Sequence, residues 1–298
     1  MLIRSISGVR GLVNTHLKPE DSVVYAKAMH KYLPDGVIVV GRDSRPSGDL
    51  ILESMCEQLV QLGRTVIHCG IVPTPTVQFM VHSTEAVGGL IVTASHNPIE
   101  WNGLKFVRED STFFHPDDCQ NLFKIVDQNP VIKSAQDPGI IWQEKNAVQK
   151  HLSSCVSLKC ISLNRIQRKR FKVVIDSVNG AGSDALPAML QALGCEVIEL
   201  NCEPNGNFTR GTEPLPENLL NLSQMVKKHH AHVGFAIDPD ADRLAIVNEK
   251  GEPLGEEYTV VLAADGYLKE MNQIEKFVLN LSSSLALDKL AELKGSSV

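Results

Sequence analysis

Short apolar runs recur along most of the chain, and each is followed by a turn and then by a helical pattern of apolar residues. The runs predict buried strands, and the helical patterns between them predict the crossover helices of a largely parallel sheet. We therefore predict an α/β fold made of tandem βα-unit domains with mostly parallel, mixed sheets. The runs are residues 37–41, 65–68, 86–93, 172–175, 195–200 and 232–237.

The helical patterns have start and stop signals. Ser47 is the predicted cap of the first helix, and Gly63 follows its end. The later helical patterns cover residues 76–82, 143–158, 181–193, 217–230, 256–271 and 285–293.

A polar, proline-containing stretch at residues 133–139 precedes a predicted domain boundary near residue 148. Beyond residue 251 the pattern supplies a single strand, residues 276–280, between two helices. One strand cannot bury a sheet, so we expect the third domain to be incomplete. The predicted domains are residues 1–147, 148–251 and 252–298.

Composition restricts the class of protein. A chain of 298 residues with 43% hydrophobic residues can form more than one core. The net charge of −6 argues against nucleic acid as a partner, because binding a polyanion needs a basic face. The seven cysteines include no Cys-x-x-Cys pair, and no apolar run is long enough to span a bilayer. We expect a cytoplasmic protein with no membrane partner.

An acidic segment, Asp238-Pro-Asp240-Ala-Asp242-Arg243, follows the sixth apolar run. Three carboxylates this close repel one another unless a cation lies between them, and Mg²⁺ fits such oxygen ligands. With Glu249, the aspartates also occupy positions 1, 3, 5 and 12 of an EF-hand calcium loop, but position 6 is Arg243 where that loop needs glycine. The alternative to a metal site is an acidic turn that is exposed to solvent and binds no ion.

Ser95 follows the third apolar run, at the end of a strand where open α/β sheets bind ligands. By itself such a serine is an ordinary turn or cap residue, and His96 beside it is an ordinary turn histidine. Arg10 lies in a glycine-rich loop at residues 7–11, which suits an anion. Lys105 is either a surface lysine or a cation near a reacting phosphate.

Two segments resemble motifs of the α-D-phosphohexomutase family, which comprises phosphoglucomutases, phosphomannomutases and phosphoglucosamine mutases. Thr-Ala-Ser-His-Asn-Pro at residues 93–98 resembles the phosphoserine loop, and residues 238–243 resemble the magnesium loop. The resemblance covers the family's first two domains and the start of its third. Further segments resemble the family in the same order, at residues 7–11, 41–45, 101–105 and 176–182.

This resemblance implies an enzyme phosphorylated on Ser95, with the phosphate and Asp238, Asp240 and Asp242 holding Mg²⁺. The phosphoryl group would pass to a hexose phosphate and return from a hexose 1,6-bisphosphate intermediate, which interconverts the 6-phosphate and the 1-phosphate. Which sugar is used stays open.

The resemblance also implies further roles. Lys105 resembles the general base, Arg10 and Arg243 would bind the phosphoryl group, and His96 is a further catalytic candidate. The family's sugar-reading loop, Gly-Glu-x-Ser-Gly-His, and its distal phosphate loop, Arg-x-Ser-Gly-Thr-Glu-Pro, do not occur. The missing loops leave open a truncated non-catalytic protein that binds a sugar phosphate or a partner. The Asp-x-Asp segment leaves open a metal-dependent phosphatase in which one of its aspartates is the nucleophile. Self-association or a complementing C-terminal part is expected as a partner.

Overall fold

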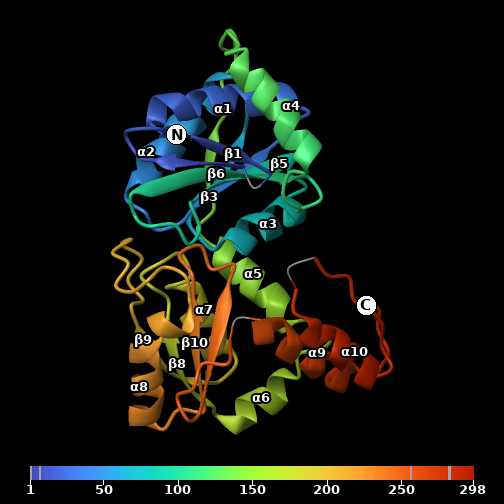
Figure 1. Ribbon diagram of the computed structural model, residues 1–298. Coiled ribbons are helices and arrows are strands. Elements are labelled where there is room, and N and C mark those ends of the chain that lie inside the picture. Colours follow the sequence, from blue (N-terminus) through green and yellow to red (C-terminus); the bar gives the residue numbers. More distant parts are fainter. Residues whose placement is uncertain (1, 7, 256, 281–282) are drawn as a thin grey trace.

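The structure is a computed structural model that describes residues 2–6, 8–255, 257–280 and 283–298. Its described residues form two sheets, one in each half of the chain, and each sheet has helices on both faces (Figure 1). This is the α/β fold of tandem domains with mostly parallel, mixed sheets that the sequence predicts. Ser7 of the glycine-rich segment and Glu256 at the start of a predicted helix lie outside the described residues.

The first sheet has seven strands among the described residues, in the order β1-β2-β6-β5-β3-β4-β7. Strands β5, β3, β4 and β7 run parallel, whereas β6 is antiparallel to both of its neighbours and β1 is antiparallel to β2. Their bounds are β1 (Ile3–Ser5), β2 (Gly8–Leu12), β3 (Ile38–Arg42), β4 (Val66–Ile71), β5 (Gly88–Val92), β6 (Trp101–Arg108) and β7 (Ile141–Gln143).

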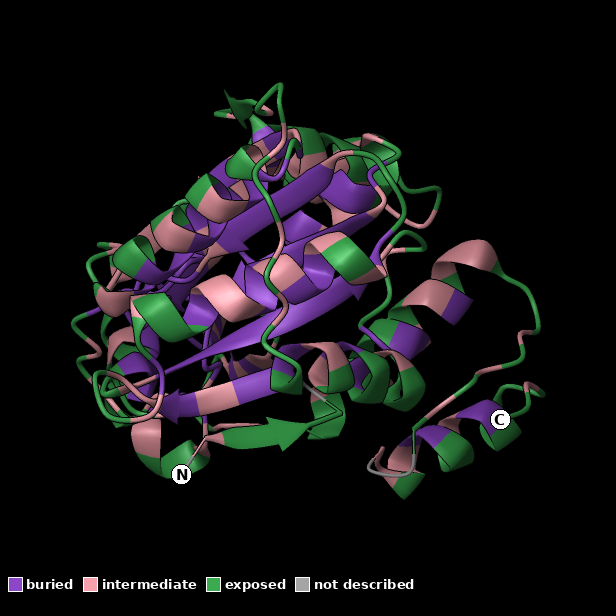
Figure 2. Ribbon diagram, turned by 90° about the horizontal axis from the view of Figure 1, so that it is seen from above, coloured by how far each residue is buried: buried purple, intermediate pink, exposed green. Residues whose placement is uncertain are grey.

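Two layers of helices cover this sheet, and its inner strands lie buried between them, whereas the edge strands β1 and β7 are exposed (Figure 2). Because side chains alternate along a strand, Ile38 and Val40 of β3 join one core and Val39 joins the other. The first core takes its helical residues from α1 (Pro19–Tyr32), α2 (Ser47–Gln61) and α4 (Pro116–Asp127), and the second from α3 (Thr74–Ser83) and α5 (Ala147–Val156).

The second sheet has the order β11-β10-β8-β9 among the described residues, with β11 antiparallel to β10 and the other pairs parallel. Val174 packs toward α8, while Val173 and Ile175 pack toward α7. The elements are α6 (Leu163–Lys169), β8 (Lys172–Asp176), α7 (Ala185–Ala192), β9 (Glu196–Leu200), the 3₁₀ helix η1 (Pro216–Asn218), α8 (Leu220–His229), β10 (Val233–Ile237) and β11 (Leu244–Asn248).

The last part of the chain forms two helices, α9 (Glu257–Met271) and α10 (Leu285–Leu293), which pack on each other. The predicted strand at residues 276–280 is wrong. Within the described part of the chain only an isolated bridge joins Lys276 to Ser297, so a ladder of strand pairs does not form there. The described residues therefore include no third sheet, and the partial third domain at residues 252–298 stays a prediction.

Other local predictions also need correction. Ser47 is the first residue of α2 and not its cap, and its Oγ accepts a hydrogen bond from Asn102 Nδ2 at 3.0 Å. Most of the predicted loop at residues 7–11 belongs to strand β2. The predicted boundary near residue 148 falls within α5 and stays a prediction. In the described part of the chain, no helix combines the length and the apolar character that crossing a bilayer requires.

Candidate active site

The two sheets meet where the carboxyl ends of their parallel strands face each other. Ser44, after β3, donates its Oγ–H to the main-chain carbonyl of Asn179, after β8, at 2.7 Å. The amide of Thr74 at the start of α3 donates to the main-chain carbonyl of Asp240, after β10, at 2.9 Å. Ligand sites in open α/β sheets lie at this edge, so the junction is where a site is expected.

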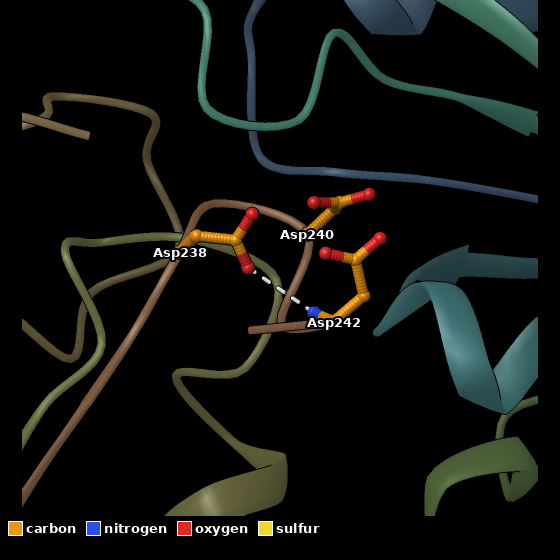
Figure 3. Close-up of side chains that lie close together, drawn as sticks. All are labelled: Asp238, Asp240 and Asp242. Atoms are coloured by element: carbon orange, nitrogen blue, oxygen red, sulfur yellow. Dashed lines mark hydrogen bonds between the residues drawn. The ribbon is translucent and has the colours of Figure 1, made fainter. Parts of the chain in front are cut away.

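The aspartate loop, residues 238–243, connects β10 to the antiparallel strand β11. Asp238 Oδ1 accepts a hydrogen bond from the amide of Asp242 at 3.1 Å (Figure 3). It also accepts one from the amide of Arg243 at 3.1 Å, and these two bonds close the turn. The three aspartates each bring a carboxylate oxygen within 4.8 Å of the others. The short spacing in sequence thus produces one acidic cluster in space.

The pKa values of the two buried aspartates in this cluster are shifted in opposite directions. Asp238 and Asp240 are fully buried. Desolvation raises the pKa of Asp238 well above its usual value, and the carboxylates of Asp240 and Asp242 raise it further. Burial alone would also raise the pKa of Asp240, but the Lys105 ammonium and the hydroxyl of Thr74 outweigh it and lower that pKa. Asp240 is therefore held as an anion more firmly than Asp238.

The donor set fits a hard divalent cation. All three side chains offer oxygen, as Mg²⁺ prefers. Asp240 Oδ1 is buried and makes no hydrogen bond in the described structure, although its other oxygen accepts from Thr74 Oγ1 at 2.7 Å. A buried oxygen without a donor suits a metal ligand, because leaving it unpaired is costly. The calcium-loop alternative is not supported, since strands and not helices flank the loop.

Ser95 belongs to the serine loop, residues 93–98, which follows β5. Its backbone is left-handed with φ of 52°, and the residue is 3% exposed. Its amide donates to Thr93 Oγ1 at 2.8 Å, and its Oγ–H donates to Asp238 Oδ2 at 3.2 Å. The structure therefore brings Ser95, the predicted site of phosphorylation, into contact with the acidic cluster, across the junction of the two domains.

Lys105 is not a surface lysine, since it lies on β6 and is 7% exposed. Its Nζ donates to Asp240 Oδ2 at 2.7 Å and to Asp242 Oδ2 at 2.9 Å. Burial by itself lowers the pKa of this lysine, but the two carboxylates more than compensate, so its pKa is raised. In this geometry Lys105 is a cation that bridges the two domains.

Two arginines and a histidine complete the surroundings. Arg10 on β2 donates from Nη1 to Asn97 Oδ1 at 2.9 Å, and Arg243 forms an ion pair with Glu213. Burial lowers the pKa of His96, and the charge of Arg243 lowers it further, which favours a neutral imidazole at neutral pH. The described site thus combines positive side chains with a buried serine hydroxyl and an acidic cluster, a composition that suits phosphoryl transfer.

The structure adds residues that the sequence reasoning did not single out. Thr74 and Glu213 bind groups of the site, and Asp43 and Arg45 lie buried beneath Ser95. Asp43 and Arg45 lie in segment 41–45, which resembles the family and directly follows an apolar run. That position could have marked them as candidate site residues. Glu213 and Thr74 carry no local signal.

Comparisons with known proteins agree with this geometry. Residues 2–131 match the family model described as "Phosphoglucomutase/phosphomannomutase, alpha/beta/alpha domain I", and residues 149–251 match the corresponding domain II. A crystal structure of a phosphoglucomutase/phosphomannomutase family protein from Burkholderia thailandensis superposes with a TM-score of 0.83 at 26% identity, over 100% of this chain and 66% of that one.

Two relatives illustrate the similarity in sequence. A Methanopyrus kandleri protein named "Probable phosphoglucosamine mutase" is 32% identical over 293 residues, which are 98% of this chain and 64% of the relative. A "Phosphoglucomutase/phosphomannomutase" of Thermococcus kodakarensis is 32% identical over 297 residues, with the same coverage. The chain thus spans just under two thirds of the length of these relatives. It belongs to the phosphoglucomutase/phosphomannomutase family.

Proposed function

We propose that this protein acts in the interconversion of a hexose 6-phosphate and a hexose 1-phosphate, with Ser95 as the reversible carrier of the phosphoryl group. The observation that supports this most is the 3.2 Å hydrogen bond from Ser95 Oγ to Asp238 Oδ2. In this geometry the Ser95 hydroxyl lies against a cluster that suits a divalent cation, which supports a role for that oxygen as the phosphoryl carrier. Family membership and the similarity to named mutases support the same reaction class.

The proposed residue roles follow from charge. A phosphoryl group on Ser95 carries a charge of about −1.5 to −2 at neutral pH, so it requires nearby cations. In the proposal Arg10 and Arg243 bind this group, Lys105 adds a third positive charge, and His96 lies beside the reacting serine. Fixed positive charges stabilise phosphoryl transfer without having to reorganise during the reaction.

The same residues would hold a magnesium ion. Asp238, Asp240 and Asp242 would supply carboxylate oxygens, and Ser95 or its phosphate would supply a further one. When bound, the ion would withdraw charge from the phosphoryl oxygens and so favour transfer in either direction.

The transfer itself exchanges one oxygen–phosphorus bond for another. The bond from Ser95 Oγ to phosphorus breaks while a hydroxyl oxygen of the hexose phosphate bonds to phosphorus, which gives a hexose 1,6-bisphosphate. The sugar then returns its other phosphoryl group to Ser95. For Lys105 to take the hydroxyl proton, as the family resemblance implies, its ammonium must first be deprotonated, and its contacts with Asp240 and Asp242 oppose this.

Phosphorus NMR tests the proposal. The chain is incubated with Mg²⁺, catalytic hexose 1,6-bisphosphate and glucose, mannose or glucosamine 1-phosphate in separate tubes, and the 6-phosphate signal is followed. We expect conversion by the wild type and by Ser153→Ala, an exposed serine of α5, and no conversion by Ser95→Ala. Calorimetric binding without conversion would instead indicate a non-catalytic sugar-phosphate protein. Inorganic phosphate release that survives Ser95→Ala would indicate the phosphatase alternative.

A further inference from the structure

A charged pair lies fully buried under the serine loop. Asp43 and Arg45, just after β3, are both 0% exposed and form an ion pair with each other. The pair is rigid, because Asp43 Oδ1 also accepts the amide of Arg45 at 2.9 Å and the amide of Asp43 donates to the carbonyl of Val92 at 3.1 Å. This arrangement joins the end of β3 to the end of β5.

Both main-chain polar groups of Ser95 connect to this pair. Arg45 Nη2 donates to the carbonyl of Ser95 at 2.8 Å and also to the carbonyl of Asn97. On the other side, the amide of Ser95 donates to Thr93 Oγ1, whose hydroxyl donates to Asp43 Oδ2 at 2.6 Å. The amide and the carbonyl of one residue are thus held through two routes that meet at the same ion pair.

The pair also contacts the second domain. The Arg45 guanidinium lies 5.0 Å from the centre of the Phe208 ring, within the range of a cation–π contact. Ser44, between the two charged residues, donates to the carbonyl of Asn179. The anchor of the serine loop is therefore fixed against the domain that carries the aspartate loop.

Stability alone does not explain this arrangement. Well-packed apolar residues are often as stabilising as a buried ion pair, or more so, because burying two charges carries a large desolvation penalty. Ser95 adds a second cost, because a residue other than glycine keeps a left-handed backbone only where the surrounding structure holds it there. The desolvation cost falls on Asp43 and Arg45 and the backbone cost on Ser95, and the hydrogen bonds described above connect the pair to Ser95.

We propose that Asp43, Arg45 and Thr93 are positioning residues that hold the Ser95 backbone in its left-handed conformation, with Oγ directed at Asp238. They do not touch the substrate and act only through Ser95. This inference rests on the proposed function, because the step it serves is the phosphorylation of Ser95. Misplacing a reacting group by about 1 Å can slow a reaction roughly 100-fold, so the expected effect is large.

Thr93 offers the sharpest test, because valine has nearly the same shape without the hydroxyl. The rate of Ser95 phosphorylation by glucose 1,6-bisphosphate with Mg²⁺ is followed by quenched-flow mass spectrometry as a function of bisphosphate concentration. Thr93→Val should lower the maximal rate constant about 10- to 100-fold and leave the half-saturating concentration unchanged. Thr93→Ser restores the hydroxyl and should recover most of the rate.

Arginine variants supply a matched control. Arg45→Lys keeps a charge beside Asp43 but loses the planar fork that reaches both the carboxylate and the carbonyls, so it should also slow phosphorylation. Arg64 is likewise buried, and it donates to the carbonyls of His30 at 2.8 Å and Leu33 at 2.9 Å, away from the serine loop. Arg64→Lys should lower the unfolding midpoint without changing the phosphorylation rate of the folded protein.

The outcomes separate the two proposals. A wild type that takes up no phosphate overturns the proposed function, and this inference with it. A phosphorylated wild type together with a Thr93→Val variant that reacts at the same rate overturns the inference alone. Slowing of Arg64→Lys as large as that of Arg45→Lys would also overturn it, because the effect would then follow stability and not the position of Ser95.

Discussion

Replacing Lys105 by methionine perturbs the site most directly. It removes a buried positive charge, while the methionine side chain still fills most of the space of the lysine side chain. The Lys105 side chain is 9% exposed and that of its partner Asp240 is 0% exposed. Breaking a buried ion pair by deleting one partner costs about 3–5 kcal/mol, since the other charge stays buried alone. The second contact, to the 28% exposed side chain of Asp242, adds about 1 kcal/mol or less. Without metal, Lys105→Met should therefore lower the free energy of unfolding by about 3–5 kcal/mol.

Magnesium should reverse much of this loss. In the variant no lysine neutralises the acidic cluster, so its carboxylates repel one another more strongly and the folded protein is less stable. A cation bound at the cluster relieves this repulsion. A ligand present at about 100 times its dissociation constant stabilises the folded state by about 2.7 kcal/mol. We expect Mg²⁺ to stabilise Lys105→Met more than it stabilises the wild type, because in the wild type the cation must compete with the ammonium.

Equilibrium urea unfolding, followed by circular dichroism in EDTA and in Mg²⁺, measures both effects. Urea is chosen because guanidinium is a salt and screens charges. Lys150→Met is the control, since the Lys150 side chain is 50% exposed and its pair with Glu144 should contribute about 1 kcal/mol or less. If Lys105→Met loses no more stability than Lys150→Met, or if Mg²⁺ stabilises variant and wild type equally, the electrostatic reasoning is wrong.

Further predictions concern the junction of the domains and the first core. Thr74→Val removes the 2.7 Å hydrogen bond to the buried Asp240 carboxylate and should cost about 1.5–3 kcal/mol in urea unfolding, whereas Thr74→Ser should cost clearly less. Gly8→Ala should lower the melting temperature by several degrees or prevent folding, because φ is +103° and a Cβ would lie 2.0 Å from the carbonyl oxygen of Leu104. Burial, reinforced by a neighbouring carboxylate, raises the pKa of Tyr32 to about 12 from 10.0. Its contribution to stability should be complete below pH 10 and be lost as the pH rises through 12, and ultraviolet titration should show a late-ionising phenol that Tyr32→Phe removes.

The parts of the fold that the sequence predicts are those with a strong local pattern. The run at residues 37–41 is apolar because β3 is buried on both faces of a parallel sheet, and the same holds for β5. Strand β6 reads Trp-Asn-Gly-Leu-Lys-Phe-Val-Arg, in which buried Asn102 and Lys105 interrupt the apolar signal. Helix α1 places Ser22 in its buried face, which weakens its helical pattern.

The candidate site divides in the same way. The aspartates lie close together in sequence, so their clustering could be predicted, and Ser95 could be placed at the end of a strand. The buried contact between Lys105 and Asp240 joins residues 135 positions apart, and nothing local in the sequence encodes it. The hydrogen bond from Arg45 to the carbonyl of Ser95 could not be predicted either, because every residue has a main-chain carbonyl and the sequence does not show which one accepts. Contacts between residues so far apart in the sequence can be identified only when the fold is known.

Phosphopeptide mapping of the purified protein, after incubation with glucose 1,6-bisphosphate and Mg²⁺, tests the central claim most directly. The account predicts one phosphoryl group on the peptide that contains Ser95, located on that serine by fragmentation, and none when EDTA replaces the metal. Ser153→Ala should be labelled like the wild type, and Ser95→Ala should remain unlabelled. Absence of phosphate on Ser95 in the wild type, or stable labelling of another residue in its place, would contradict Ser95 as the phosphoryl carrier.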